Sequence, residues 1–132
     1  MTSQLYRRWL LELWNGDFGL ARELVTPSFA GHWPGMEVSG PEGLVEALEQ
    51  AHAPFADVKV SLDVGPIVDG DLVSARWTFA GTYRGGLPGA TAAEGTRIAF
   101  SGHDILRAED GRFAEYWVIS DTESLARALG ME

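Results

Sequence analysis

The stretch Ser101-Gly102-His103-Asp104-Ile105-Leu106-Arg107 alternates like a β-strand but places an acid on its apolar side. Every second residue of a strand points to the same face, so Asp104 shares a face with Ile98, Phe100 and Leu106. A carboxylate among apolar side chains loses its hydration and requires compensating partners. The stretch therefore predicts a half-buried strand that carries an acid of functional interest.

The sequence around this stretch predicts a meander of strands. Apolar and polar residues alternate in four segments, and Asp69-Gly70 and Asp110-Gly111 mark turns between neighbouring ones. The predicted strands cover residues 58–64, 72–83, 97–107 and 112–120. A glycine-rich loop, residues 84–95, separates the second strand from the third and is a candidate lid over a pocket.

The N-terminal half has the 3.6-residue period of helices. The first predicted helix contains Leu5 to Leu13 and stops at Asn15-Gly16, and the second ends before Pro27. The third follows the capping box that starts at Ser39, and a short C-terminal helix starts at Asp121. Residues 29–36 are expected to form a loop, because they are rich in Gly and Pro. Helices that precede an antiparallel sheet predict a single α+β domain over residues 1–132, with three N-terminal helices on one face of a curved sheet.

Composition limits the classes of partner. The 132 residues are 45% hydrophobic, with five Trp and six Phe, which is ample for one packed core. The chain has no Cys, and its three His residues lack metal-ligand spacing, so we expect neither a metal nor another cofactor. A net charge of −9 disfavours nucleic acid and anionic membranes. Without a signal-peptide pattern or a long apolar run, we expect a cytoplasmic protein whose partner is a small molecule or another protein.

The two faces of the predicted strands allow two interpretations. Trp77 and Phe79 lie on one face of their strand, whereas Arg76 lies on the other. The sheet is either half solvated or curled around a cavity with a second subunit on its back. In the second case we expect Arg76 to share the pocket with Asp104, and a homodimer to form through the side of Trp77, Phe79, His103 and Trp117.

Several motifs resemble the SnoaL-like polyketide cyclase family, within the nuclear transport factor 2-like superfamily that also contains ketosteroid isomerase. They are Trp14-Asn15-Gly16-Asp17-Phe18, residues 76–83, Gly102-His103-Asp104-Ile105-Leu106-Arg107 and residues 110–117. The resemblance implies a cone-shaped curved antiparallel sheet and three helices around a pocket, commonly in a dimer. It leaves the reaction open, because this fold hosts isomerases, cyclases, hydrolases and binding proteins.

The resemblance also assigns candidate roles. The acid/base Asp of SnoaL-type cyclases falls on Val118, which cannot transfer a proton, and their His falls on Asp104. In the ketosteroid isomerase pattern, the oxyanion-hole Asp matches Asp104, the base falls near His32, and the tyrosine of the first helix falls on Leu10. Under that pattern, His32 and Asp104 both carry side chains that can transfer a proton or donate a hydrogen bond.

The leading hypothesis is a cofactor-independent isomerase or cyclase that acts on a carbonyl-bearing polycyclic or polyketide-like substrate. His32 would take a proton beside the carbonyl, and Asp104, kept neutral by burial, would stabilise the enolate oxygen. The predicted substrate-binding residues are Trp33, Met36, Arg76, Tyr116 and Val118.

Other interpretations of these residues remain open. The pocket could belong to a binding module without catalysis or to a cofactor-free hydroxylase. Asp104 and Arg76 could form a buried ion pair that only organises the sheet, His32 could cap a turn, and the aromatic residues could be ordinary core.

Overall fold

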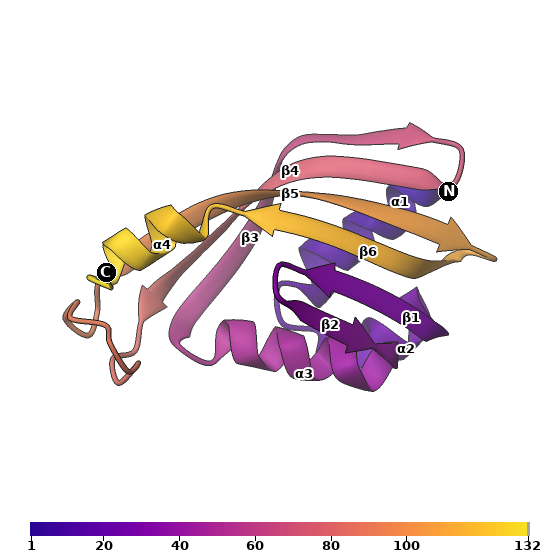
Figure 1. The fold of residues 1–132 in the computed structure, drawn as a ribbon. Helices are drawn as coiled ribbons and strands as arrows, with labels where there is room; N and C mark the ends of the chain where they lie inside the picture. The colour runs from indigo at the N-terminus through magenta and orange to yellow at the C-terminus, as the bar shows by residue number, and fades with distance from the viewer. Residues whose placement is uncertain (132) are drawn as a thin grey trace.

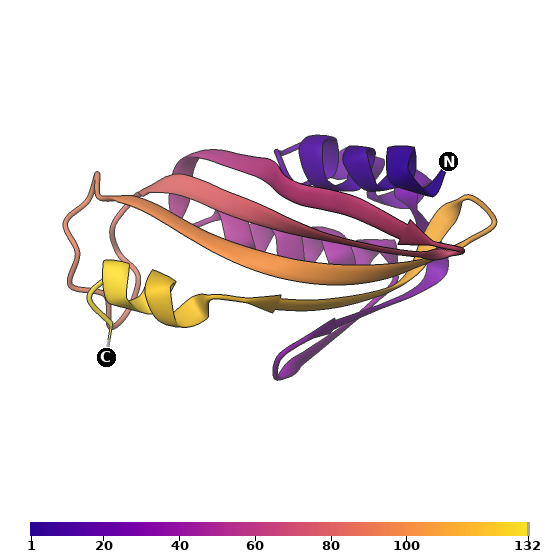
Figure 2. The ribbon, with the colours of Figure 1, turned by 90° about the horizontal axis from the view of Figure 1, so that it is seen from above.

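The computed structural model describes residues 1–131, and its main element is a six-stranded curved sheet with the strand order β2-β1-β6-β5-β4-β3 (Figure 1). The strands are β1 (Val25–Trp33), β2 (Met36–Ser39), β3 (Phe55–Asp69), β4 (Leu72–Tyr83), β5 (Arg97–Glu109) and β6 (Arg112–Ser120). Seen from above, the long strands β3 to β6 bend along their length (Figure 2). This bend turns one face of the sheet inward over the helices.

The helices cover the inner face. They are α1 (Thr2–Arg8), the π-helix η1 (Trp9–Leu13), the 3-10 helix η2 (Phe18–Leu20), α2 (Ala21–Leu24), α3 (Gly40–His52) and α4 (Thr122–Ala128). Helix α1 packs against β3 and β4, whereas α3 packs against β1 and β2. No helix in residues 1–131 is long and apolar enough to cross a membrane. The predicted α+β fold, with a cone-shaped curved sheet and three N-terminal helical segments, is confirmed.

The first hairpin differs from the prediction. Residues 29–36 were expected to form a loop, but they form most of β1, a turn at Pro34-Gly35 and the start of β2. Strand β1 runs parallel to β6, so the sheet is mixed rather than wholly antiparallel. Gly31 avoids a clash in this strand, because a Cβ atom there would lie 2.7 Å from Cζ3 of Trp33 and would displace the indole ring.

The register of β4 against β5 decides which residues face inward. Ala75 lies opposite Asp104, and Arg76 lies opposite His103. Trp77 and Phe79 are therefore on the inner face with Asp104, whereas Arg76 is on the outer face. The expectations that Arg76 shares the pocket with Asp104, and that Trp77 and Phe79 belong to the outer side, are both wrong.

Gly102 allows Trp77 to lie flat on the inner face. These residues are opposite each other, and a Cβ atom on Gly102 would lie 2.3 Å from Cζ2 and 2.5 Å from Cη2 of Trp77. A contact this short cannot be kept, so any side chain at Gly102 displaces the indole ring. Gly102, two residues before Asp104, thus leaves the space in which the Trp77 ring packs against β5.

We predict that Gly102→Ala destabilises the fold by about 1–3 kcal/mol, because the added methyl group overpacks the inner face. Gly19→Ala is the matched control, since its Cβ atom would meet only Oδ1 of Asp17 at 4.0 Å. Urea denaturation followed by tryptophan fluorescence measures both variants. Equal stability of the two would contradict the packing described for Trp77.

Candidate active site

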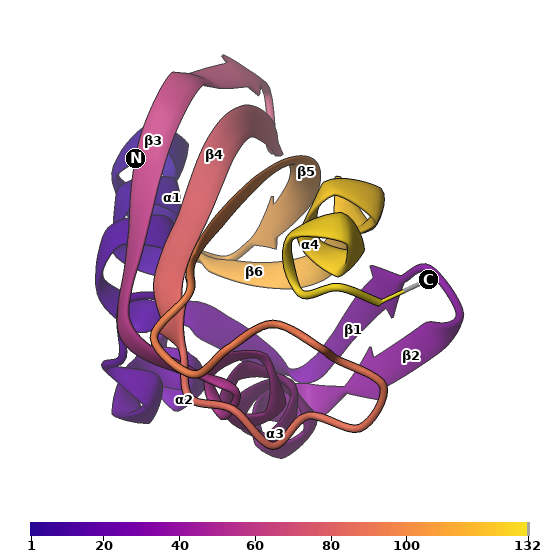
Figure 3. The same ribbon diagram turned by 90° about the vertical axis from the view of Figure 1, so that its left-hand side faces the viewer.

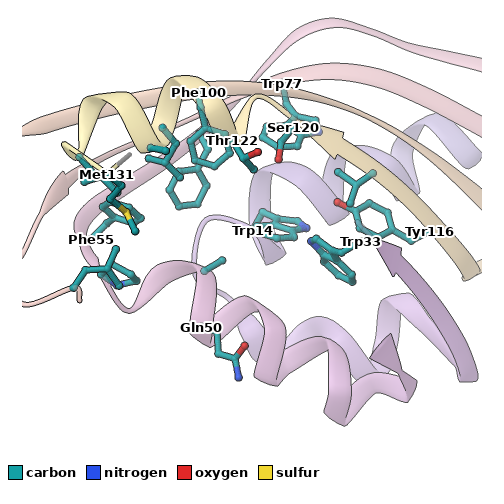
Figure 4. Close-up of a pocket in the computed structure, with 18 residues that line it drawn as sticks. Trp14, Trp33, Gln50, Phe55, Trp77, Phe100, Tyr116, Ser120, Thr122 and Met131 are labelled. Carbon is teal, nitrogen blue, oxygen red and sulfur yellow. The ribbon is translucent and has the colours of Figure 1, made fainter. Parts of the chain in front are cut away.

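A cavity of about 380 Å³ lies between the inner face of the sheet, α3, α4 and the loop after β4 (Figure 4). Its walls are rich in aromatic rings, from Trp14, Trp33, Phe55, Trp77, Phe79, Phe100 and Tyr116. No charged side chain in residues 1–131 lines it, and the polar side chains in its lining besides those of the tryptophans and Tyr116 are Gln50, Ser120 and Thr122. Such a lining suits a neutral, largely apolar molecule.

One wall of the cavity is formed by two segments that are distant in sequence. Leu87 of the loop and Leu129 and Met131 after α4 all line the cavity. The backbone N–H groups of Thr91 and Ala92 each donate to the Leu129 carbonyl oxygen at 3.0 Å. Figure 3, which views this end of the molecule, shows the loop and α4 beside the end of the curved sheet. The hydrogen bonds join the two segments into one cover.

Asp104 does not line this cavity but borders a small void beside it, and it is the one buried charged residue in residues 1–131, with 2% of its surface exposed. The Tyr6 hydroxyl of α1 lies 3.0 Å from Oδ1 and 3.2 Å from Oδ2 of this carboxyl group, to which it donates. Four aromatic residues, Trp14, Trp77, Phe79 and Tyr116, line both the large cavity and a small void beside Asp104. These rings stand between the carboxyl group and the cavity.

Burial controls the ionisation of Asp104. Desolvation raises the pKa of this carboxyl to about 7, although the hydrogen bond from Tyr6 opposes the shift. The nearby indole N–H of Trp77 also lowers this pKa, yet it lacks hydrogen-bond geometry and is buried without a partner. Burial and the charge of Asp104 raise the pKa of Tyr6 and of Tyr116, so both phenols stay protonated. Asp104 can therefore both donate and accept a proton near neutral pH.

The structure places only some of the predicted substrate-binding residues in the cavity. Trp33, Tyr116 and Val118 line it. Met36 does not, because it starts β2 next to the hairpin turn and is 40% exposed. Arg76 is on the outer face, where Nη1 lies 3.1 Å from Nε2 of His103.

His32 belongs to the outer face. Its Nδ1 lies 2.6 Å from Glu37 Oε1, its Nε2 lies 2.7 Å from Glu115 Oε2, and its ring stacks on Trp117. The hydrogen bond to Glu115 is the largest effect and raises the pKa of His32; desolvation opposes it, and the hydrogen bond to Glu37 adds a smaller increase. His32 and Asp104 both line an outer groove of about 460 Å³, but the carboxyl group of Asp104 turns inward to Tyr6, and neither residue lines the large apolar cavity.

Sequence reasoning missed Tyr6. The ketosteroid isomerase pattern places its helical tyrosine on Leu10, and Tyr6 precedes Leu10 by one helical turn, on the same face. Leu10 lines the small void, while Tyr6 reaches the carboxyl group itself. Shifting the pattern by four residues would have found the donor.

No cluster of three or more metal-binding side chains occurs in the part of the chain that the structure describes.

Comparisons with known proteins agree with this fold and identify the family. A family model described as SnoaL-like polyketide cyclase matches residues 4–129. The structure of TsrD from Streptomyces laurentii is 32% identical with a TM-score of 0.82, and the match covers 98% of this chain and 94% of TsrD. IdmH from Streptomyces antibioticus, named as a candidate polyketide cyclase, is 26% identical with a TM-score of 0.84 over 99% of each chain. AclR from Streptomyces galilaeus, named as a candidate hydroxylase, is 23% identical over 98% of this chain and 80% of AclR with a TM-score of 0.83, which shows the fold alone. No curated protein matches the chain.

We predict that Asp104→Asn removes a pH dependence of stability. The folded-state pKa is about 7 and the unfolded value is about 3.8, so between these values the folded protein holds a proton that the unfolded chain has released. The free energy of unfolding of the natural chain therefore falls as pH rises through this window, by about 4 kcal/mol in total.

Asp104→Asn lacks this component, so its stability relative to the natural chain should increase from about pH 4 to about pH 7 and stay constant above. Urea denaturation across this range measures the difference. Asp71→Asn, at an exposed position, is the control. Parallel curves for Asp104→Asn and the natural chain would show that the Asp104 pKa is not raised.

Proposed function

The chain belongs to the SnoaL-like polyketide cyclase family, and we propose that it isomerises or cyclises a neutral, apolar, carbonyl-bearing polycyclic or polyketide-like molecule without a cofactor. The observation that carries the proposal is Asp104, an acid with a pKa of about 7 that borders a small void, which shares four aromatic lining residues with the apolar cavity. A group whose pKa is close to the working pH is the most effective general acid and base.

The position of Asp104 relative to Val118 supports this role. The resemblance to SnoaL-type cyclases assigns their acid/base carboxylate to Val118, and Val118 lies directly opposite Asp104 in the pairing of β5 with β6. Opposite residues of antiparallel strands have Cβ atoms about 4.5–5.5 Å apart. In the proposal, the carboxylate has moved by one strand and serves the same region of the cavity.

The proposed reaction uses one proton and no oxidant. Ionised Asp104 accepts the proton lost by the carbon next to the substrate carbonyl, which leaves an enolate. Protonated Asp104 then returns the proton, either to another carbon in an isomerisation or to the alkoxide that forms when the enolate carbon attacks a second carbonyl. Tyr116, whose hydroxyl points into the cavity, is the polar group between Asp104 and the substrate (Figure 4).

We also propose that the protein forms a homodimer through the outer face of β5 and β6. Ile119, Ile105 and Trp117 are 71%, 45% and 37% exposed on this face, which is a large apolar area for a surface in contact with water. His32 and His103 border the same face, in an outer groove of about 460 Å³. A second copy would cover the apolar side chains, with the polar groups at the rim.

We predict that the protein accelerates hydrogen–deuterium exchange next to the carbonyl of the tetralones, which are bicyclic enolisable ketones, in D2O followed by NMR. Asp104→Asn should reduce the catalysed rate by about a hundredfold or more, because the amide cannot carry the proton. Asp71→Asn controls for the loss of one exposed carboxylate.

Binding of a tetralone without catalysed exchange would favour the binding-module interpretation, and oxygen consumption would favour a hydroxylase. His32→Ala tests the base role expected from the sequence. If His32→Ala reduces the catalysed exchange rate as much as Asp104→Asn does, the result would favour His32 as the base and contradict the role proposed for Asp104.

For the dimer, we predict that Ile119→Glu weakens association by about tenfold or more, because it buries an unpaired charge in the interface. Ile67→Glu is the matched control, since Ile67 is 64% exposed on β3, an edge strand that β4 separates from β5. Sedimentation velocity over a range of concentrations measures both variants. A monomeric natural chain, or an Ile119→Glu variant that associates normally, would contradict the proposal.

A further inference from the structure

A small void beside Asp104 has the size of one water molecule. Its volume is about 10 Å³, close to the minimum that holds a single water and too small for two. Its lining consists of Leu10, Trp14, Val60, Trp77, Phe79, Asp104 and Tyr116. The void thus lies between the buried carboxyl group and the rings that wall the large cavity.

Four residues that line this otherwise apolar space carry a polar side-chain group. They are Asp104, Trp14, Trp77 and Tyr116. Trp77 is 8% exposed, and its N–H is buried with no hydrogen-bond partner in residues 1–131. Apolar voids stay dry, whereas a buried water needs about two to four polar partners. A buried N–H without a partner is costly, so a water acceptor here would stabilise the fold.

We propose that this void binds one water molecule, which accepts a hydrogen bond from Trp77 and joins the Asp104 carboxyl to the Tyr116 hydroxyl as a proton relay. The proposal rests on the proposed function, and it explains how a carboxyl group behind four aromatic rings reaches a substrate in the large cavity. Tyr116 lines both spaces, and it is near enough to Asp104 for the carboxylate to affect its ionisation.

The relay conserves every proton. As the substrate carbon releases its proton to the Tyr116 oxygen, the hydroxyl proton of Tyr116 moves to the water, and one water proton moves to the Asp104 carboxylate. The enolate is then the only group that has lost a proton and Asp104 the only one that has gained one. The reverse transfers protonate the product, so Tyr116 touches the substrate and Asp104 stores the proton.

Val60 provides a way to change the void without altering any polar group. Val60 is 3% exposed and lines the void, so Val60→Ile adds a methylene group where the water would lie. Val60→Ala enlarges the same space and admits more water. Val58→Ile is the control, because Val58 is on the same strand but borders a separate polar groove with Asn15 and Arg84.

The test combines three measurements on these variants. The ¹³Cγ chemical shift of Asp104, titrated by NMR, should show its pKa raised by about one unit in Val60→Ile, because the carboxylate loses a donor, and lowered in Val60→Ala. Catalysed exchange of the tetralones should fall by about tenfold or more in Val60→Ile. A high-resolution crystal structure of the natural chain should contain a water within hydrogen-bond distance of Trp77 Nε1 and Asp104. Val58→Ile should change neither the pKa nor the exchange rate.

Absence of water density in the void, or an Asp104 pKa that is the same in Val60→Ile, Val60→Ala and the natural chain, would overturn the relay. Loss of exchange in Asp104→Asn alongside normal exchange in Val60→Ile would overturn the relay and keep the proposed reaction. The expected pKa shifts without exchange of any tetralone would support the water site and count against the proposed reaction.

Discussion

Helix α1 covers Asp104 and removes its carboxyl group from water, and this desolvation governs the chemistry of the site. The unfavourable burial of the charge is offset in part by the Tyr6 hydroxyl, which reaches the carboxyl group from α1. Burial outweighs the hydrogen bond and raises the pKa of Asp104 to about 7, so the protonated and ionised forms are about equally populated near physiological pH. A buried acid that lowers stability when ionised is the kind of local conflict that proteins retain at functional sites.

The remaining elements create the buried environment that sets the ionisation of Asp104. The bend of the sheet lets residues from β4, β5 and β6 face α1 and η1 around one point, and Gly102 gives Trp77 the space to lie beside the carboxyl group. The aromatic walls keep bulk water away, so the environment that raises the Asp104 pKa is also one that accepts an apolar guest. Fold, ionisation and cavity therefore depend on the same packing of α1 against the inner face.

Local patterns predicted much of this structure. Alternation placed Asp104 on the buried face of its strand, and the capping and turn residues located most helices and hairpins, because these signals act over a few residues. Contacts between distant segments were less accessible. Alternation along β4 places Trp77 and Phe79 on the same face of the strand. Only the register of β4 against β5 shows that this face is the one that carries Asp104, and that Arg76 lies on the other face. His32 lies in the outer network because β1 pairs in parallel with β6, a pairing that no local pattern indicates.

The acid site and one wall of the cavity are built from different parts of the chain. The acid site depends on α1, β4 and β5, whereas the wall consists of the loop after β4 and the residues after α4, which are joined by hydrogen bonds at Leu129. Substitutions, insertions or deletions in these two segments can therefore change which molecule fits the cavity, while the residues around Asp104 stay unchanged.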